Sequence, residues 1–397
     1  MIGSDRRFVL VAVMLSLIVS CSSGAPTAVA PKVPVPAASI AVPTSALPFR
    51  DPPAALLSPT DRAALQLILD NVVAGFRRQP ESTATAPGIT AAVVTARGSW
   101  SGAAGTGGDG TPLGADAMMD IGSITKTFTA AEVVDLARRG AIDLDAPASQ
   151  YLDHPLLARH PTVRQLLSMQ SGVSEFTNEP FVAAVMASPS RSWTSEESLS
   201  YAHGQPAAPG TGFAYTNSNY LLLGLLIEKV THTTYAAALR RDLLQRSNVW
   251  RVAVQDSEVP TPPLGAPGKD AGALPGDPYL PTRAWVSSTT AAGGMAADAA
   301  SVARWGYELY GGRLLPPDAV REMTTAGPTG YGLGTEIEPL PKLGTDEGHI
   351  GVIPGYTSAL IVVPERQTAV SVLIPHNSDA HYIARLLVIV TAILAPR

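Results

Sequence analysis

Ser123 and Lys126 are the residues of this sequence whose types and spacing most clearly suggest chemistry. They stand three positions apart within residues 120–128, and in a helix this spacing places both side chains on one face, one turn apart. A serine hydroxyl becomes a nucleophile when a neighbour takes its proton, and a lysine held as a neutral amine in a desolvated site can do this. The pair therefore indicates acyl transfer through a covalent intermediate on Ser123.

Two further motifs follow the serine–lysine pair along the chain. Among the five lysines of the sequence, only Lys126 has a serine three positions before it. Residues 215–217 form the only Tyr-x-Asn of the chain, and residues 349–351 form the only His-x-Gly. A phenol, an amide and an imidazole are groups that can move protons and orient a substrate next to a serine nucleophile.

In this order the three motifs resemble those of the penicillin-recognising serine hydrolases. This family contains class C β-lactamases, secreted D-alanyl-D-alanine carboxypeptidases and related esterases, and Ser-x-x-Lys is one of its marks. The resemblance runs from about Ala84 to the C-terminus and includes the segments Ile142–Asp145, Thr162–Ser168, Ser171–Val173 and Gly330–Gly334.

The resemblance implies a role for each residue of the first two motifs. Ser123 attacks the substrate carbonyl and becomes acylated, and Lys126 helps to remove its proton. Tyr215 passes a proton to the leaving group and later takes one from the attacking water. Asn217 binds the acyl side of the substrate and orients Lys126.

The resemblance also assigns the segment around the third motif. His349 stands where most family members carry a lysine, and we expect it to be a donor over the pocket. Gly351 and Val352 follow on a strand at the substrate-binding edge, where the N–H groups of Val352 and Ser123 form an oxyanion hole. Phe181 is a candidate pocket wall. The family needs no cofactor, and the other histidines lack metal-ligand spacing: His154, His160, His203, His232, His376 and His381.

Two departures from the carboxypeptidase pattern bear on the substrate. Carboxypeptidases of this branch hold the substrate's terminal carboxylate with hydroxyl residues within and just after His-x-Gly, where this chain has Ile350 and Val352. The family's carboxylate-binding arginine is replaced by the stretch 335–338, in which Glu336 and Glu338 would repel a carboxylate. The sequence thus leaves several functions open: a D-alanyl-D-alanine carboxypeptidase, a hydrolase of related amides or esters, a weak β-lactamase, or a non-catalytic lipoprotein that binds penicillin or peptidoglycan stem peptides.

The composition excludes some partners. The net charge of −5 is spread over 397 residues without a basic block, so no nucleic-acid partner is expected. With 46% hydrophobic residues, the chain can bury a large core, and its length suggests about two domains or subdomains. The expected partners are a small-molecule, ester or peptidoglycan stem-peptide substrate and a membrane.

The membrane is expected because of the first residues. Residues 1–20 resemble a lipoprotein signal peptide, with Arg6 and Arg7 before an apolar stretch too short to span a bilayer. Cys21, the only cysteine, then stands where a lipid would be attached. We expect an exported protein, anchored by this lipid to the outer face of the bacterial cytoplasmic membrane. An ordinary signal peptide with an incidental cysteine is the alternative, and twin-arginine export stays open.

The rest of the sequence predicts an Ala/Pro-rich tether over residues 21–55 and a hydrolase domain over residues 56–397. Helical spacing follows Ser58, a strand is expected over 88–94, and a helix over 123–139 ends at Gly140. Thr162 is expected to cap a short helix, and a very apolar helix follows at 219–229. Late strands are predicted over 331–338, 347–351, 356–364 and 369–374, with a final helix over 384–394.

This order of elements predicts an α/β fold in which an antiparallel sheet is flanked by N- and C-terminal helices. The α/β part comprises about 56–122 and 290–397, and a mostly helical part is inserted at about 123–289.

Overall fold

The computed structural model describes residues 47–76, 88–204, 207–268, 271–327 and 329–376, together with residues 383, 384, 387 and 388. All of these belong to one compact unit, Ala41–Arg397. The signal segment, Cys21 and the tether up to residue 46 lie outside the described residues, and so does most of the predicted final helix.

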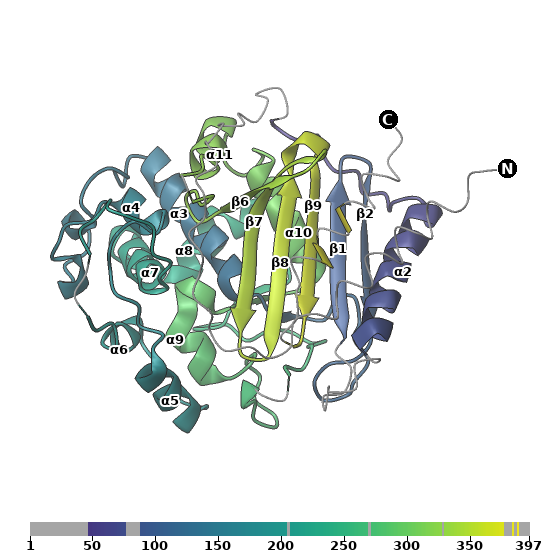
Figure 1. Cartoon of the computed structure of the whole chain (residues 1–397), viewed down its shortest axis with the longest axis horizontal. Coiled ribbons are helices and arrows are strands. Elements are labelled where there is room, and N and C mark those ends of the chain that lie inside the picture. The colour runs from purple at the N-terminus through teal and green to yellow at the C-terminus, as the bar shows by residue number, and fades with distance from the viewer. Residues whose placement is uncertain are drawn as a thin grey trace, which may run out of the picture. The chain divides into compact units, whose positions relative to one another are not determined.

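A six-stranded antiparallel sheet forms the centre of this unit (Figure 1), with the strand order β2-β1-β9-β8-β7-β6. The pairing of β1 with β9 joins the beginning of the described chain to its end. This confirms the predicted α/β fold assembled from both ends of the chain. The strands are β1 (Ile89–Thr95), β2 (Gly98–Ala104), β6 (Glu336–Leu340), β7 (Gly344–Ile353), β8 (Tyr356–Val363) and β9 (Thr368–Ile374).

Helices cover both faces of the sheet because the side chains of a strand alternate between its faces. In β1, Ile89 and Val93 pack with residues of α2 (Pro59–Phe76), whereas Ala92 and Val94 belong to the core shared with α10 (Ala299–Tyr310). The strand is therefore buried along its whole length.

A group of helices lies beyond the β7–β6 side of the sheet, in the teal and green part of Figure 1. The described chain also contains a small three-stranded sheet, in the order β3-β5-β4. The elements are α3 (Thr125–Arg138), α4 (Val163–Leu167), α5 (Glu179–Ala187), α6 (Ser195–Leu199), α7 (Ser218–Thr231), α8 (Tyr235–Asp242), α9 (Arg283–Gly293) and α11 (Pro317–Met323), with β3 (Met119–Asp120), β4 (Val252–Val254) and β5 (Met295–Ala297). The domain boundaries given above stay a prediction.

Local sequence signals determine where several of these helices begin or end. The Ser58 hydroxyl accepts a hydrogen bond from the Asp61 N–H (3.1 Å) at the start of α2, and Thr162 forms a capping box at the start of α4. Gly140, with φ of +75°, follows the end of α3. These three predictions are confirmed.

Other predicted boundaries were wrong. The strand expected over 331–338 begins only at Glu336, because Gly330 and Gly334 adopt positive φ values that interrupt an extended chain. A further strand, β2, which the sequence did not predict, follows β1 and pairs antiparallel with it. In the part of the chain that the structure describes, no helix is long and apolar enough to cross a membrane.

Candidate active site

The nucleophile lies in a tight turn between the small sheet and α3. Ser123 is the middle residue of a 3₁₀ turn, Gly122–Ile124, directly before α3. The buried Asp120 carboxyl accepts the Gly122 N–H (2.6 Å) on one oxygen and a Gln255 side-chain N–H (3.1 Å) on the other. Burial raises the pKa of Asp120 well above its ordinary value, and these hydrogen bonds oppose that shift. The turn is thus tied to the protein interior.

Two glycines allow β7 to lie directly against this turn. Gly122 has φ of +51°, and a Cβ placed there would lie 2.7 Å from the Val352 backbone nitrogen. A Cβ on Gly351 would lie 2.0 Å from the Ile121 carbonyl oxygen. Both distances are shorter than a Cβ can tolerate, so only glycine permits this approach.

The approach brings a strand N–H toward Ser123. The N–H of Ile350 donates to a side-chain oxygen of Glu336 (3.1 Å), so it points away from the pairing with β8. N–H groups two residues apart in a strand point to the same side, and that of Val352 therefore faces the same edge. This arrangement suits an oxyanion hole made of the Ser123 and Val352 N–H groups.

Lys126 is fully buried beneath the nucleophile. Its Nζ lies 2.8 Å from Ser123 Oγ, 2.8 Å from Asn217 Oδ1 and 2.7 Å from the Ala292 carbonyl oxygen. Burial lowers the pKa of Lys126 to about 7, although the negative charges of Glu175 and Glu336 oppose this shift. A neutral amine donates to Asn217 and Ala292 and keeps its lone pair for the Ser123 hydroxyl proton.

The last turn of α9 supplies one of these acceptors. Thr290 has non-helical dihedral angles (φ 13°, ψ −101°) inside the helix. Just beyond the break, the carbonyl of Ala291 accepts from the Thr129 hydroxyl (2.7 Å), and that of Ala292 accepts from Lys126. Ala291 and Ala292 both lie in the last turn of α9, where carbonyl groups have no partner within the helix.

Tyr215 approaches the nucleophile from the other side. Its hydroxyl donates to Ser123 Oγ (3.0 Å), while the residue as a whole remains 39% exposed. Burial of the hydroxyl raises the pKa of Tyr215 well above its ordinary value, although the hydrogen bond to Ser123 opposes the shift. Tyr215 therefore stays a phenol at neutral pH, and it can act as an acid toward a leaving group.

Glu175 holds Asn217 in place, a function that the sequence did not predict. Its Oε2 accepts the Asn217 backbone N–H (2.5 Å), and its Oε1 accepts the N–H (2.8 Å) and hydroxyl (2.9 Å) of Thr177. The side-chain Nδ2 of Asn217 also lies 3.4 Å from Glu175. The Asn217 amide is thus turned with its oxygen toward Lys126.

His349 is buried beside Tyr215, with 6.2 Å between the two ring centroids, and is not an exposed donor over the pocket. The imidazole is buried, with Nδ1 2.6 Å from the Ile350 carbonyl oxygen and Nε2 3.1 Å from the Tyr331 hydroxyl. Burial lowers the pKa of His349, so the ring is neutral at pH 7. A neutral ring that donates from Nδ1 to the carbonyl accepts the Tyr331 hydroxyl at Nε2. His349 therefore positions Tyr331, whose ring lies 6.2 Å from that of Tyr215.

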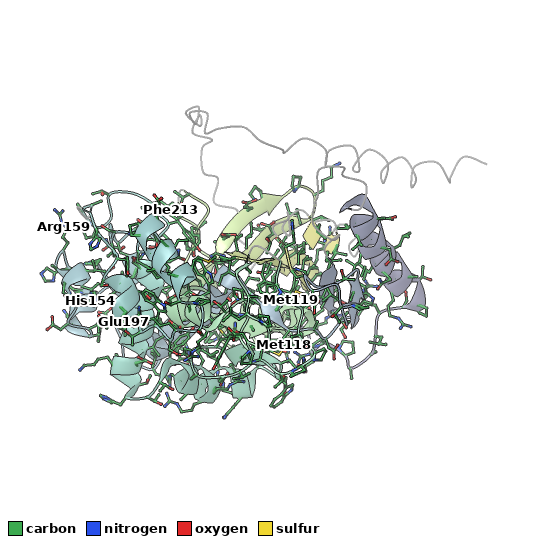
Figure 2. The ribbon with its side chains drawn as sticks, turned by 90° about the horizontal axis from the view of Figure 1, so that it is seen from below. Met118, Met119, His154, Arg159, Glu197 and Phe213 are labelled. Carbon is green, nitrogen blue, oxygen red and sulfur yellow. The ribbon has the colours of Figure 1, made fainter. Side chains whose placement is uncertain are left out.

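Phe181 does not line the site. Its side chain is fully buried and packs edge-on against Phe176 (4.8 Å between ring centroids) and Trp193 (5.7 Å), so it is a core residue. An aromatic ring that does lie near the site is Phe213, which is 39% exposed and 5.6 Å from the Tyr331 ring. Figure 2 shows Phe213 at the surface of the helical part, apart from the more central Met118 and Met119.

No group of three or more His, Cys, Asp or Glu side chains is placed to hold a metal ion within the described residues. The chemistry that this geometry supports is serine acyl transfer, with a lysine base and a tyrosine acid on the same hydroxyl oxygen.

The comparison with protein families agrees with this geometry. Residues 70–390, more than half of the chain, match the Beta-lactamase family. The chain belongs to this family of serine hydrolases. The resemblance inferred from the three sequence motifs is thereby confirmed.

The chain is also similar to curated proteins and to solved structures. Protein flp of Staphylococcus aureus (strain COL) is 30% identical over 135 residues, which cover 32% of this chain and 26% of flp. The chain thus spans about a quarter of the length of the curated relatives that it matches first.

Two solved structures cover most of the chain. A D-stereospecific amidohydrolase from Streptomyces sp. is 28% identical with a TM-score of 0.69, over 81% of this chain and 97% of that one. The D-amino acid amidase from Ochrobactrum anthropi SV3 shares the fold at 24% identity and a TM-score of 0.71, over 84% of this chain and 99% of that one.

Proposed function

We propose that the protein hydrolyses amide or ester bonds through an acyl-enzyme on Ser123, and that its substrates carry no carboxylate near the scissile bond. Amides of D-amino acids are the substrate class that we propose. The observation that carries the catalytic part is the position of Ser123 Oγ, 2.8 Å from Lys126 Nζ and 3.0 Å from the Tyr215 hydroxyl. A base and an acid contact the same reacting atom.

The proposed acylation follows from these contacts. The Lys126 amine takes the Ser123 proton while Oγ bonds to the carbonyl carbon, and the carbonyl oxygen gains its negative charge between the N–H groups of Ser123 and Val352. Tyr215 gives its proton to the leaving nitrogen or oxygen as that bond breaks, and it regains one from the Lys126 ammonium. In deacylation a water molecule replaces the leaving group, and the proton transfers run in reverse.

The charges and side chains near the reacting atoms support the substrate class. Glu175 and Glu336 both place negative charge near Lys126, and Ile350 and Val352 offer no side-chain hydrogen bond to a carboxylate. A carboxylate left poorly paired in such a site weakens binding. The likeness to the D-stereospecific amidohydrolase from Streptomyces sp. supports an amide substrate.

A substrate panel tests this proposal. D-Phenylalanine amide, p-nitrophenyl acetate, nitrocefin and a peptide ending in D-Ala-D-Ala are given to the wild type and to Ser123→Ala. We expect the amide or the ester to be hydrolysed at least about tenfold faster (kcat/KM) than the D-Ala-D-Ala peptide, because the peptide's carboxylate lacks a partner, and we expect Ser123→Ala to hydrolyse none.

The panel separates the competing functions. Efficient hydrolysis of the D-Ala-D-Ala peptide with poor amide and ester turnover would favour a carboxypeptidase, and fast nitrocefin turnover would favour a β-lactamase. A protein that binds labelled penicillin but turns over none of the four compounds would be a non-catalytic binding protein.

We also propose that a lipid on Cys21 holds this hydrolase at the outer face of the cytoplasmic membrane. The proposal is supported by the charged and apolar segments before Cys21 and by the absence of any other cysteine in the sequence. A structural disulfide within the chain needs a second cysteine, which leaves lipid attachment as the function that we assign to this thiol.

Cys21→Ala is expected to prevent lipid attachment. The protein should then either keep its signal segment, seen as slower migration on a gel, or appear in the medium in place of the membrane fraction. Ser20→Ala, next to the same site, should leave the protein in the membrane. A Cys21→Ala protein with normal mobility and normal membrane content would contradict the lipid anchor.

A further inference from the structure

Glu336 places a carboxylate at the free edge of β7, beside the candidate active site. It is the first residue of β6, and its Oε2 accepts the Ile350 N–H (3.1 Å), while its Oε1 lies 3.4 Å from His349 Nδ1. Its side chain is 32% exposed. An ionised carboxylate can accept about four hydrogen bonds, so the exposed carboxylate oxygens of Glu336 can accept further hydrogen bonds from a ligand.

The negative charge of Glu336 acts on the reacting groups. Burial dominates the pKa shifts of Lys126, Tyr215 and His349, and Glu336 raises the pKa of each of them through its charge. Glu175 is the other carboxylate that acts on Lys126 and Tyr215. When Lys126 is the neutral amine that the reaction needs and His349 is neutral, this part of the site carries negative charge. A positive charge on the substrate would offset it.

The position of Glu336 indicates which part of a substrate it meets. Ile350 stands two residues before Val352 on one strand edge, a separation of about 7 Å along β7. Tyr215 is the group that protonates the leaving atom in the proposed reaction, and its ring lies 6.2 Å from that of His349, whose Nδ1 is 3.4 Å from Glu336. A group a few bonds beyond the leaving atom can therefore approach the Glu336 carboxylate, whereas the acyl side lies next to Asn217.

We propose that Glu336 determines specificity for the leaving group: it favours leaving groups that carry an ammonium charge and disfavours those that carry a carboxylate. This inference rests on the proposed acyl-enzyme function. Among amides or esters with the same acyl group, it favours those whose alcohol, thiol or amine portion is positively charged a few bonds from the scissile bond.

Three thioesters with the same acyl group test the inference. Acetylthiocholine has a cationic leaving group, S-(3,3-dimethylbutyl) thioacetate is its neutral carbon isostere, and S-acetyl-3-mercaptopropionate is anionic. Release of the free thiol gives kcat/KM for each. We expect the wild type to prefer the cationic over the neutral thioester by about tenfold at low ionic strength, and to use the anionic one least. This preference should shrink in about 1 M NaCl because salt screens partly exposed charges.

Glu336→Gln keeps an oxygen for the Ile350 N–H but removes the charge. We expect it to reduce the cationic-to-neutral ratio to within about twofold. It should also move the acid limb of the pH–rate profile to lower pH, because the charge that raises the pKa of Lys126 is lost. The matched control is Glu338→Gln, which removes the same charge from the same strand. Glu338 pairs with Asp346, whereas Glu336 pairs with Gly348 nearer the site, so the control ratio should stay within about twofold of wild type.

The outcomes separate the inference from the function on which it rests. A wild type that hydrolyses the neutral thioester but shows no preference for the cationic one overturns the role of Glu336 and leaves the hydrolase standing. An unchanged ratio in Glu336→Gln also overturns it. If none of the thioesters and none of the earlier panel is hydrolysed, the proposed function itself is wrong. If Glu336→Gln does not fold, the preference of the wild type for the cationic thioester and the salt dependence of that preference still test the inference.

Discussion

Lys126→Met is expected to slow the acylation of Ser123 by about 10²–10⁴-fold, the range for a lost general base. Methionine keeps much of the buried stem of the lysine but has no lone pair for the Ser123 proton. The rate is measured with a serine-directed fluorophosphonate, and mass spectrometry identifies the labelled peptide. Lys229→Met is the matched control, because Lys229 is exposed near the end of α7, and it should label at the wild-type rate.

Labelling at a different serine, or a Lys126→Met rate within about tenfold of wild type, would contradict the assignment of Lys126 as the base. A fall in the labelling rate of both lysine variants would point to a general loss of folding, which thermal unfolding of each variant would reveal.

The same assignment fixes the direction of the pH dependence. The active form of Lys126 is the neutral amine, and burial lowers its pKa to about 7. As the pH rises toward 7, the neutral fraction grows, so kcat/KM should increase about tenfold per pH unit below 7 and level off above it. Because burial raises the pKa of Tyr215, its ionisation should not lower the rate near neutral pH. Activity that falls as the pH rises from 6 to 8 would contradict a lysine base.

The parts of this site that could be predicted from the sequence are those that depend on short spacing. Ser123 and Lys126 share one helical neighbourhood, so their contact follows from a separation of three residues. The antiparallel strands near the C-terminus could likewise be predicted from apolar runs of strand length. The cap at Thr162 depends on the capping-box side chains of neighbouring residues.

The parts that could not be predicted depend on the folded chain. Glu175 contacts Asn217 across 42 positions, and nothing in either segment indicates this pairing. Thr290 breaks α9 without a proline or glycine at that position, so this kink has no local signal. The sequence predicts Phe181 as a pocket wall, whereas packing against Trp193 and other aromatic rings places it in the core.

The close approach of β7 to the nucleophile turn leads to the second large effect. Gly122→Ala should lower kcat by at least about 100-fold, comparable to the loss of an oxyanion-hole donor. The new Cβ would lie 2.7 Å from the Val352 nitrogen, so Val352 and the turn must separate. Gly140→Ala is the matched control: Gly140 also has positive φ (+75°), but a Cβ there meets nothing within 4 Å. Both variants lose roughly 1–2 kcal/mol of stability from the left-handed conformation, and only Gly122→Ala should lose activity.

A second variant removes the hydrogen-bond donor itself and leaves Gly122 unchanged. Val352→Pro deletes the Val352 N–H, which faces the strand edge, so the hydrogen bonds of the pairing with β8 are kept. Its side chain is 63% exposed, so little packing is lost. We expect kcat with a neutral ester to fall by about 10²–10³-fold while the unfolding temperature stays near that of wild type. If Val352→Pro keeps kcat within about threefold of wild type, the charge that develops on the substrate oxygen is stabilised elsewhere. The effect of Gly122→Ala would then arise from displacement of Ser123 itself.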